Sequence, residues 1–258
     1  MLKNKKGIIF GIANDHSIAW GIAKKLSENG AEIGITYQND ILLKRVKPLA
    51  EKINSKLLIK CDFSEENSIK QCFEEIKEKF HKIDFIIHAV AYSDKNELNG
   101  KYLNTSKDNF INTLNISCFS FTEIAKEASK IMNVGGSLLT LSFYGANKVM
   151  PNYNVMGVAK AALETSVKYL SVDLGSQEVR VNAISAGPMR TLAGAAISNA
   201  RDVYNYTQKN SPLKRNVSLE ELGNTALYFV SNLSKSVTGE IHYVDCGFNI
   251  IGMPNSSS

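Results

Sequence analysis

Short apolar segments alternate with longer amphipathic segments along almost the whole chain, and this alternation constrains the fold more than any other feature of the sequence. Several of the short segments are almost wholly apolar, as strands buried on both faces require. The short segments cover 7–13, 32–37, 56–62, 84–90, 137–142, 179–185 and 240–245. Strands that alternate with helices form a parallel sheet with helices on both faces. We therefore predict a single doubly wound α/β domain over residues 1–258, with a seven-stranded sheet in the order 3-2-1-4-5-6-7.

The longer segments show the apolar spacing of amphipathic helices. Predicted helices cover 17–29, 41–53, 110–132, 154–174 and 219–230. A further helix is predicted to open at Ser64, because an apolar stripe follows it at helical spacing. Residues 191–211 are rich in small and polar side chains and lack strong apolar periodicity, so no element is assigned to them. The tail at 254–258 is expected to fray.

Composition excludes several classes of protein. The chain has 30 basic and 25 acidic residues, scattered singly, and a formal charge of +5, so a tract that binds nucleic acid is not expected. The four cysteines lie far apart with no histidine at ligand spacing, which indicates free thiols in a reducing compartment, the cytoplasm, and no metal site. No apolar run approaches the roughly 18 residues of a membrane span, so no membrane association is expected.

A ligand of such a sheet binds outside the carboxyl ends of the strands, at the point where the strand order reverses. The loops after the first, fourth, fifth and sixth predicted strands lead to that point. They begin near Gly11, Ala89, Ser142 and Ala186. The predicted site is therefore assembled from segments that are far apart in the sequence.

The turn after the first strand, GIANDHSIAWGIA at 11–23, suits a phosphate group. Gly11 and its small neighbours let the backbone approach a pyrophosphate, and the helix that follows offers free N–H groups. Ser17 could cap that helix and donate its hydroxyl to a phosphate. The other interpretation is an ordinary turn with Ser17 as its N-cap, but the strand–turn–helix context favours a nucleotide site.

Residues after the second and third strands are candidates for binding adenosine. At the position of Gln38, an acidic residue selects a ribose 2′-hydroxyl and a basic residue accepts a 2′-phosphate, so the uncharged Gln38 favours NADH over NADPH. Lys44 and Arg45 lie about a turn into the next helix and could simply be solvated. Asp62 could accept from the adenine amino group with Phe63 beside the ring, or it could only flank the next helix.

Tyr153 and Lys160 lie seven positions apart on a predicted helix, so their side chains share a face and stand about 10 Å apart along the axis. A nearby ammonium strengthens a phenol as an acid, and Lys160 could also hold ribose hydroxyls. The alternative is a core tyrosine with a lysine that reaches solvent, but the position beside the switch point favours a catalytic pair.

Two further features have a structural alternative. After the sixth strand, a Gly-Pro turn exposes the backbone of 189–191, which could bond a carboxamide or be a plain strand exit. His88 lies inside an apolar strand and is interpreted as a core residue with satisfied hydrogen bonds rather than as a ligand.

With these residues in place, the chain resembles the bacterial enoyl-acyl-carrier-protein reductases of the short-chain dehydrogenase superfamily. Ordinary members of the superfamily carry TGxxxGxG and Tyr-x-x-x-Lys, whereas here the turn reads GIAxxxSIAxG and six residues separate Tyr153 from Lys160. That combination is specific for the enoyl reductases. The match runs from about residue 6 to residue 253 and rests on the segments GIANDHSIAWGIA, CDF, PNYNVMGVAK, VRVNAISAGPMRTLA and GEIHYVD.

The resemblance implies a Rossmann domain, usually assembled as a homotetramer. It implies transfer of a hydride from NADH to C3 of a trans-2-enoyl thioester on acyl carrier protein, in fatty-acid elongation. Tyr153 falls on the tyrosine that hydrogen-bonds the thioester carbonyl, Lys160 on its catalytic partner, and Ser93 near the acyl-thioester site. Cofactor positions fall on Gly11, Ser17, Ile18, Gln38, Asp62, Phe63, Val90, Lys160, Met189, Arg190, Thr191, Leu192 and Ala193. Residues 191–211 match a mobile substrate lid, in which Arg201 could contact the acidic carrier protein.

One position departs from the family pattern. The family commonly has a second tyrosine ten residues before the first, where this chain has Phe143 followed by Tyr144. Adjacent residues at a strand end point apart, so Tyr144 is not expected to replace the missing phenol. Two other functions stay open: a carbonyl reductase or alcohol dehydrogenase of the same superfamily, and a non-catalytic NAD(H)-binding module. The intact pair of Tyr153 and Lys160 argues against the second.

Overall fold

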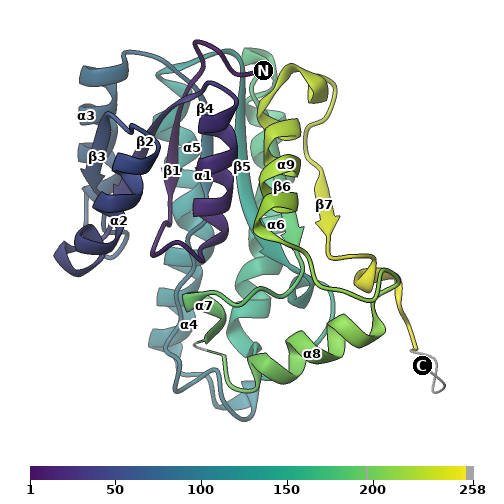
Figure 1. The fold of residues 1–258 in the computed structure, drawn as a ribbon. Helices are drawn as coiled ribbons and strands as arrows, with labels where there is room; N and C mark the ends of the chain where they lie inside the picture. The colour runs from purple at the N-terminus through teal and green to yellow at the C-terminus, as the bar shows by residue number, and fades with distance from the viewer. Residues whose placement is uncertain (196, 254–258) are drawn as a thin grey trace.

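All seven strands of the computed structural model, which describes residues 1–195 and 197–253, pair in parallel in one sheet (Figure 1). The strand order is β3-β2-β1-β4-β5-β6-β7, which confirms the predicted topology. The strand bounds are β1 Lys6–Phe10, β2 Glu32–Tyr37, β3 Leu57–Lys60, β4 Ile83–His88, β5 Met132–Phe143, β6 Arg180–Ala186 and β7 Ile241–Val244.

Helices cover both faces of the sheet, as predicted. One face carries α1 (Ile18–Glu28), α2 (Asp40–Lys52) and α9 (Leu219–Val230), and the other carries α3 (Ser68–Phe80), α4 (Lys107–Leu114), α5 (Ser120–Ser129) and α6 (Asn154–Asp173) (Figure 1). Two short helices, α7 (Leu192–Ala195) and α8 (Ala200–Asn210), lie beyond the carboxyl ends of the strands.

The apolar cores on the two faces of the sheet explain why the central strand segments are mostly apolar. Successive strand residues point to opposite faces, so Ile8 and Phe10 of β1 pack on the α3 side of the sheet while Ile9 packs on the α1 side. β4 is buried along its whole length for the same reason. A strand with one polar face could not occupy these central places.

The predicted helix at 110–132 differs from the structure at both ends and in the middle. The helical segment begins at Lys107, because the Ser106 hydroxyl accepts from the N–H of Asn109 and caps it. A π-helical turn, Asn115–Phe119, separates α4 from α5. The helix ends at Ser129, because the chain at Met132 already pairs with Ile83 of β4 and continues through a register shift into β5.

The predicted start of a helix at Ser64 is also wrong, because α3 begins at Ser68. Asn67 takes a left-handed conformation with φ of 63°, which breaks helical continuity before that point. The Ser68 hydroxyl instead accepts from the N–H of Asp62. Ser64 therefore belongs to the loop after β3, where it contacts a candidate site residue.

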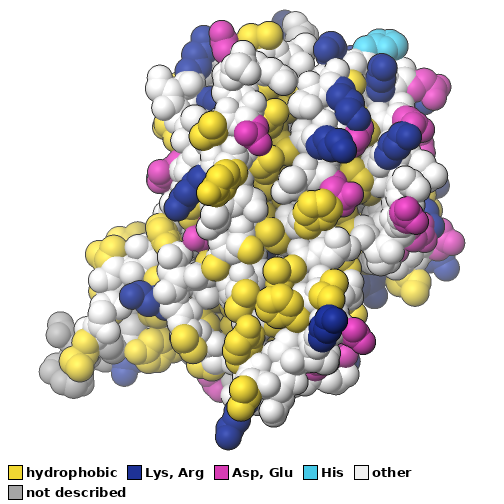
Figure 2. All heavy atoms as spheres, turned by 180° about the vertical axis from the view of Figure 1, so that it is seen from behind, with side chains coloured by type: hydrophobic (Ala, Val, Ile, Leu, Met, Phe, Trp, Pro, Cys, Tyr) yellow, Lys and Arg dark blue, Asp and Glu magenta, His cyan; other side chains and the backbone are white. Residues whose placement is uncertain are grey.

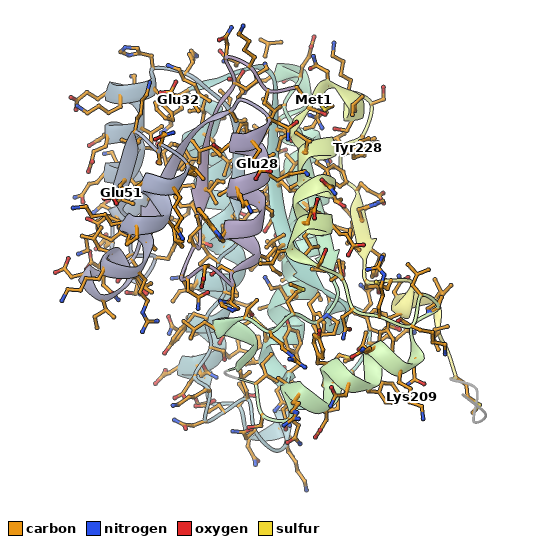
Figure 3. The ribbon with its side chains drawn as sticks, viewed as in Figure 1. Met1, Glu28, Glu32, Glu51, Lys209 and Tyr228 are labelled. Atoms are coloured by element: carbon orange, nitrogen blue, oxygen red, sulfur yellow. The ribbon has the colours of Figure 1, made fainter. Side chains whose placement is uncertain are left out.

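The two ends of the sheet differ in what lies beyond them. Glu28 and Glu32 mark the amino end of the strands, whereas Lys209 of α8 lies at the opposite end, beyond their carboxyl termini (Figure 3). Among the described residues, no helix combines the length and the apolar character needed to cross a bilayer. The predicted fraying of 254–258 falls outside the described residues.

Candidate active site

The turn between β1 and α1 makes a close contact with the end of β4. Gly11 has a φ of +97°, and a Cβ atom at this position would collide with the carbonyl oxygen of Ala89. Glycine is required here, because a side chain would be strained by the backbone conformation as well as by that contact. Two loops of the predicted site therefore touch each other directly.

Ser17 stands at the N-cap of α1, but its hydroxyl does not cap the helix. The hydroxyl accepts from the N–H groups of Ala13 and Asn14, both at 3.1 Å, and no side-chain bond closes the first turn. The predicted side-chain cap is therefore wrong, because the Ser17 hydroxyl accepts from N–H groups of the preceding loop instead of from the helix. Because α1 begins at Ile18 without such a cap, its first N–H groups stay available to an anion.

Gln38 and Asp62 lie side by side at the ends of β2 and β3. The Gln38 amide donates to Asp62 Oδ1 at 3.2 Å, and Ser64 donates to the same oxygen from its N–H and its hydroxyl, at 3.0 and 2.7 Å. Partial burial opposes ionisation, but these hydrogen bonds hold the pKa of Asp62 below its usual value. Asp62 is therefore an ionised acceptor, and Phe63 beside it packs its ring 6.0 Å from that of Phe10.

Val90 and Ser93 follow β4 in the loop that leads to α4. Val90 is half-buried against the core on the α3 side of the sheet. The Ser93 hydroxyl accepts from Thr113 at 2.9 Å and donates to Asn109 Oδ1 at 3.3 Å. Helix α4 thus fixes the position of Ser93 with one donor and one acceptor.

His88 ends β4 and is confirmed as a core residue. Its Nδ1 lies 2.8 Å from Thr140 Oγ1 and its Nε2 lies 3.0 Å from Ser120 Oγ. Burial, together with the nearby charge of Lys160, lowers the pKa of His88 to about 3. The ring is therefore neutral at physiological pH.

Tyr153 is the N-cap residue of α6, and only 7% of it is exposed. Its ring packs edge-on against Phe143 with 5.0 Å between the centroids, and a Cβ on Gly145 would collide with it. Among the described residues, the phenol oxygen has no hydrogen-bond partner. The phenol can therefore donate a hydrogen bond to a bound ligand.

The acidity of this phenol differs from the expectation. The sequence suggested that Lys160 makes Tyr153 a stronger acid, but burial, and then the Glu164 carboxylate, raise the pKa of Tyr153. The two side chains are separated along the helix, so the ammonium does not offset the loss of solvent. Tyr153 therefore stays protonated at neutral pH and can act as a hydrogen-bond donor.

Phe143 and Tyr144 point to different sides, as expected at a strand end. Phe143 lies on the Tyr153 ring, whereas the ring of Tyr144 packs against Phe248 at 5.8 Å and against Tyr243 at 6.5 Å. The phenol of Tyr144 is therefore directed toward the C-terminal segment rather than toward the ring of Tyr153.

Lys160 is buried about two turns along α6 from Tyr153, on the same face of the helix, and only 6% of it is exposed. Its Nζ donates to the carbonyl oxygen of Leu141 at 2.8 Å. Burial lowers the pKa of Lys160 to about 8, against the opposing influence of Cys118 and Glu164. The alternative of a lysine that reaches solvent is therefore wrong.

The chain leaves β6 in a tight turn at the predicted carboxamide-binding segment. The Thr191 N–H donates to Met189 O at 3.0 Å, and the Thr191 hydroxyl accepts from the N–H of Gly194 at 3.0 Å. Leu192 and Ala193 begin α7. The contact of this backbone with a cofactor stays a prediction.

Arg190 ties this turn to the next helix. Its guanidinium carbon lies 4.5 Å from the centre of the Tyr204 ring of α8, within the range of a cation–π contact. Residues 191–211, which had no assigned element, thus contain α7 and α8 at the carboxyl end of the sheet. Their role as a mobile lid stays a prediction.

Comparisons with known proteins agree with this geometry. A family model described as enoyl-(acyl carrier protein) reductase matches residues 11–249. An enoyl-[acyl-carrier-protein] reductase [NADH] from Rhizobium meliloti is 58% identical over 254 residues, which cover 98% of this chain and 95% of that protein. The chain belongs to the enoyl-(acyl carrier protein) reductase family.

Solved structures extend the likeness to the backbone of this enoyl reductase. The crystal structure of FabI from Candidatus Liberibacter asiaticus has a TM-score of 0.96 and 56% identity, and the match covers 98% of each chain. A reductase from Anaplasma phagocytophilum, solved in complex with NAD, has a TM-score of 0.95 and 53% identity, with 98% and 97% of the two chains covered.

Sequence reasoning missed one group in this enoyl reductase, the buried carboxylate of Glu164. It lies on α6 one turn beyond Lys160 and accepts from Ser142 and Asn147. A glutamate four positions after the lysine, inside an apolar helical stripe, is the signal that could have found it. The other candidates follow the carboxyl ends of the strands, from Phe63 after β3 to Met189 after β6.

Proposed function

We propose that the chain reduces the trans-2 double bond of enoyl thioesters carried on acyl carrier protein, with NADH as the hydride donor, in fatty-acid elongation. The observation that carries the proposal is the pair formed by Tyr153 and Lys160 at the carboxyl end of the sheet. Burial keeps the phenol protonated, it has no hydrogen-bond partner among the described residues, and the ammonium is buried farther along the same face of α6. The family relationship supports the same reaction.

The residues present fit a dinucleotide. The junction of Gly11 with Ala89 leaves no room for a side chain, and the uncapped start of α1 offers N–H groups to a pyrophosphate. Asp62 supplies an ionised acceptor for an adenine amino group, with Phe63 and Gln38 beside it. Val90, Ile18 and the backbone of 189–193 would complete the contacts, with Lys160 on the ribose. When bound, NADH supplies the hydride.

Tyr153 would act on the thioester carbonyl. Addition of a hydride at C3 moves negative charge onto the carbonyl oxygen, and a donor aimed at that oxygen then binds more tightly. Because burial keeps the phenol of Tyr153 protonated, it can donate such a bond throughout the step. Ser93, fixed by α4, would lie near the acyl thioester.

Enoyl reduction can be separated from the alternatives by the choice of substrate. We expect oxidation of NADH with crotonyl-acyl-carrier protein and no comparable oxidation with acetoacetyl-acyl-carrier protein. A preference for the acetoacetyl thioester would support a carbonyl reductase. Binding of NADH without turnover of either thioester would support a non-catalytic module.

We expect kcat/KM with NADH to exceed that with NADPH by about tenfold or more, a difference of about 1.4 kcal/mol. Gln38 is uncharged and donates to the ionised Asp62, so a 2′-phosphate at this position would meet a neighbouring carboxylate. A Gln38→Arg variant should narrow the difference. Equal use of NADPH by the unmodified chain would contradict the assignment and would point to Lys44 or Arg45 as the phosphate contact.

We also propose a homotetramer, on the family resemblance and on apolar side chains exposed on the outer helices. Hydrophobic side chains gather over the middle of the face that α4, α5 and α6 cover (Figure 2). Exposed members of this face are Ile111, Phe119, Val158, Tyr169 and Val172. Tyr228 projects from α9 on the opposite side of the sheet (Figure 3). Sedimentation at the mass of a monomer would contradict this assembly.

A further inference from the structure

Glu164 is a buried carboxylate beside the active site, with 8% of the residue exposed. It lies four residues after Lys160 on α6, on the same face of the helix as Tyr153 and Lys160. None of the functions assigned above uses it. A carboxylate is seldom buried unless hydrogen bonds or a nearby opposite charge offset the free-energy cost of its desolvation.

Its two oxygens hold the two ends of one short segment. Oε1 accepts from the Ser142 hydroxyl at 2.5 Å, and Oε2 accepts from the Asn147 amide at 3.0 Å. The same amide nitrogen lies 3.0 Å from the hydroxyl of Tyr243 on β7. The carboxylate of Glu164 thus binds both ends of the segment 142–147, which leaves β5 and carries Phe143.

This segment forms the wall against which the Tyr153 ring packs. Phe143 lies edge-on to the ring, and a Cβ on Gly145 would collide with it. A Cβ on Gly157 of α6 would come within 2.8 Å of the Gly145 carbonyl oxygen. The segment and the helix therefore touch backbone to backbone, and a shift of 142–147 would move the ring of Tyr153.

The Glu164 carboxylate also raises the pKa of the Lys160 ammonium, against the effect of burial. The two side chains bind adjacent residues of β5, since Lys160 donates to the Leu141 carbonyl and Glu164 accepts from Ser142. Four other titratable groups face this pair: His88 of β4, Cys118 of the π-helical turn, Tyr153 and Tyr243 of β7. Burial favours the neutral form of each of these four groups, which leaves the Glu164 side chain as the candidate counter-ion of Lys160 among the described residues.

We propose that Glu164 is a positioning residue for the reduction, which holds the segment 142–147 against the Tyr153 ring and acts as counter-ion to the Lys160 ammonium. This role rests on the function proposed above. Glu164 touches no reacting atom and acts through its two neighbours on α6.

The counter-ion role sets the sign of a pH effect. Removal of the negative charge of Glu164 destabilises the ammonium form of Lys160. The pKa of Lys160, about 8 in the intact protein, should therefore fall. A fall of about one unit is at the lower end of what an opposite charge at close range provides. The alkaline limb of the kcat/KM profile should then move to lower pH by the same amount.

The test compares three variants in the crotonyl-acyl-carrier-protein assay between pH 6 and pH 9. Glu164→Gln keeps the shape and removes the charge, so we expect roughly a fivefold loss at pH 8 and near-normal kcat/KM at pH 6. Glu164→Asp keeps the charge but shortens the reach to Ser142 and Asn147. It should keep the alkaline limb and lower kcat. Asp173→Asn, an exposed change on the same helix, should match the unmodified enzyme.

The outcomes separate this inference from the proposed function. If the unmodified chain does not turn over crotonyl-acyl-carrier protein, the proposed function fails. If it does and the profile of Glu164→Gln superimposes on it, the counter-ion role is overturned. If Glu164→Asp keeps full kcat, the positioning role is overturned, and this variant decides the matter should Glu164→Gln not fold.

Discussion

Replacement of Tyr153 by phenylalanine should lower kcat on crotonyl-acyl-carrier protein by about 10²–10³-fold, the usual loss when one donor to a developing oxyanion is removed. The change deletes only the hydroxyl, and that hydroxyl has no protein partner among the described residues. The packing of the ring against Phe143 is kept, so the fold and the affinity for NADH should be nearly unchanged. The loss should therefore appear in kcat more than in KM.

Tyr144→Phe is the matched control for this experiment. It removes a phenol from the adjacent part of the chain, but one that is directed toward Tyr243 and Phe248. Its kcat should stay near normal, and the double variant should behave like Tyr153→Phe. A normal kcat for Tyr153→Phe together with a large loss for Tyr144→Phe would show that the donor is misassigned.

Replacement of Lys160 by methionine should raise the Kd for NADH by about 10- to 100-fold and lower kcat/KM at least as much. A hydrogen bond to a charged group contributes about 1.5–3 kcal/mol, and the ammonium is the proposed contact for the ribose hydroxyls. Methionine keeps most of the buried volume of the lysine side chain, so the loss of NADH affinity measures the contribution of the ammonium group. Fluorescence titration with NADH, alongside steady-state kinetics, measures both quantities.

Stability provides the control for this second variant. Loss of the ammonium leaves the Leu141 carbonyl without its donor and the Glu164 carboxylate without its counter-ion, so the Tm should fall by several degrees. Adding Glu164→Gln should restore part of the Tm but none of the NADH affinity. Lys168→Met, an exposed lysine on the same helix, should leave both unchanged. An unchanged Kd in Lys160→Met would remove its role in binding the ribose.

The architecture could be predicted because local pattern and global fold agree. Each central strand is buried on both faces, so its run of apolar residues can be recognised in the sequence without knowledge of the neighbouring strands. The alternation of strands with helices then leaves few possible topologies. The errors in the fold lie where tertiary contacts override the local pattern. The residues at 132–136 follow a helix and contain two glycines, yet Met132 already pairs with Ile83 of β4, and the pairing resumes at Ser137 after a register shift.

The site was predictable as a set of positions but less so as chemistry. Spacing placed Tyr153 and Lys160 on one face of a helix, and topology placed Gly11 at the switch point. Spacing could not show that burial dominates the acidity of Tyr153, or that Ser17 turns back toward Ala13 and Asn14. Those outcomes depend on solvent exclusion and on competing donors, which only the assembled loops define.

The placement of Tyr153, Lys160 and Glu164 on the single helix α6 has a consequence for how the gene can vary. Each residue of a helix turns the chain by about 100°, so one inserted or deleted residue between positions 153 and 164 would carry part of the constellation to another face. Substitutions on the outer face of α6 leave the spacing intact. This stretch of the coding sequence should therefore accept replacements at an outward position such as Val158 but no change of length, whereas surface loops elsewhere can lengthen or shorten.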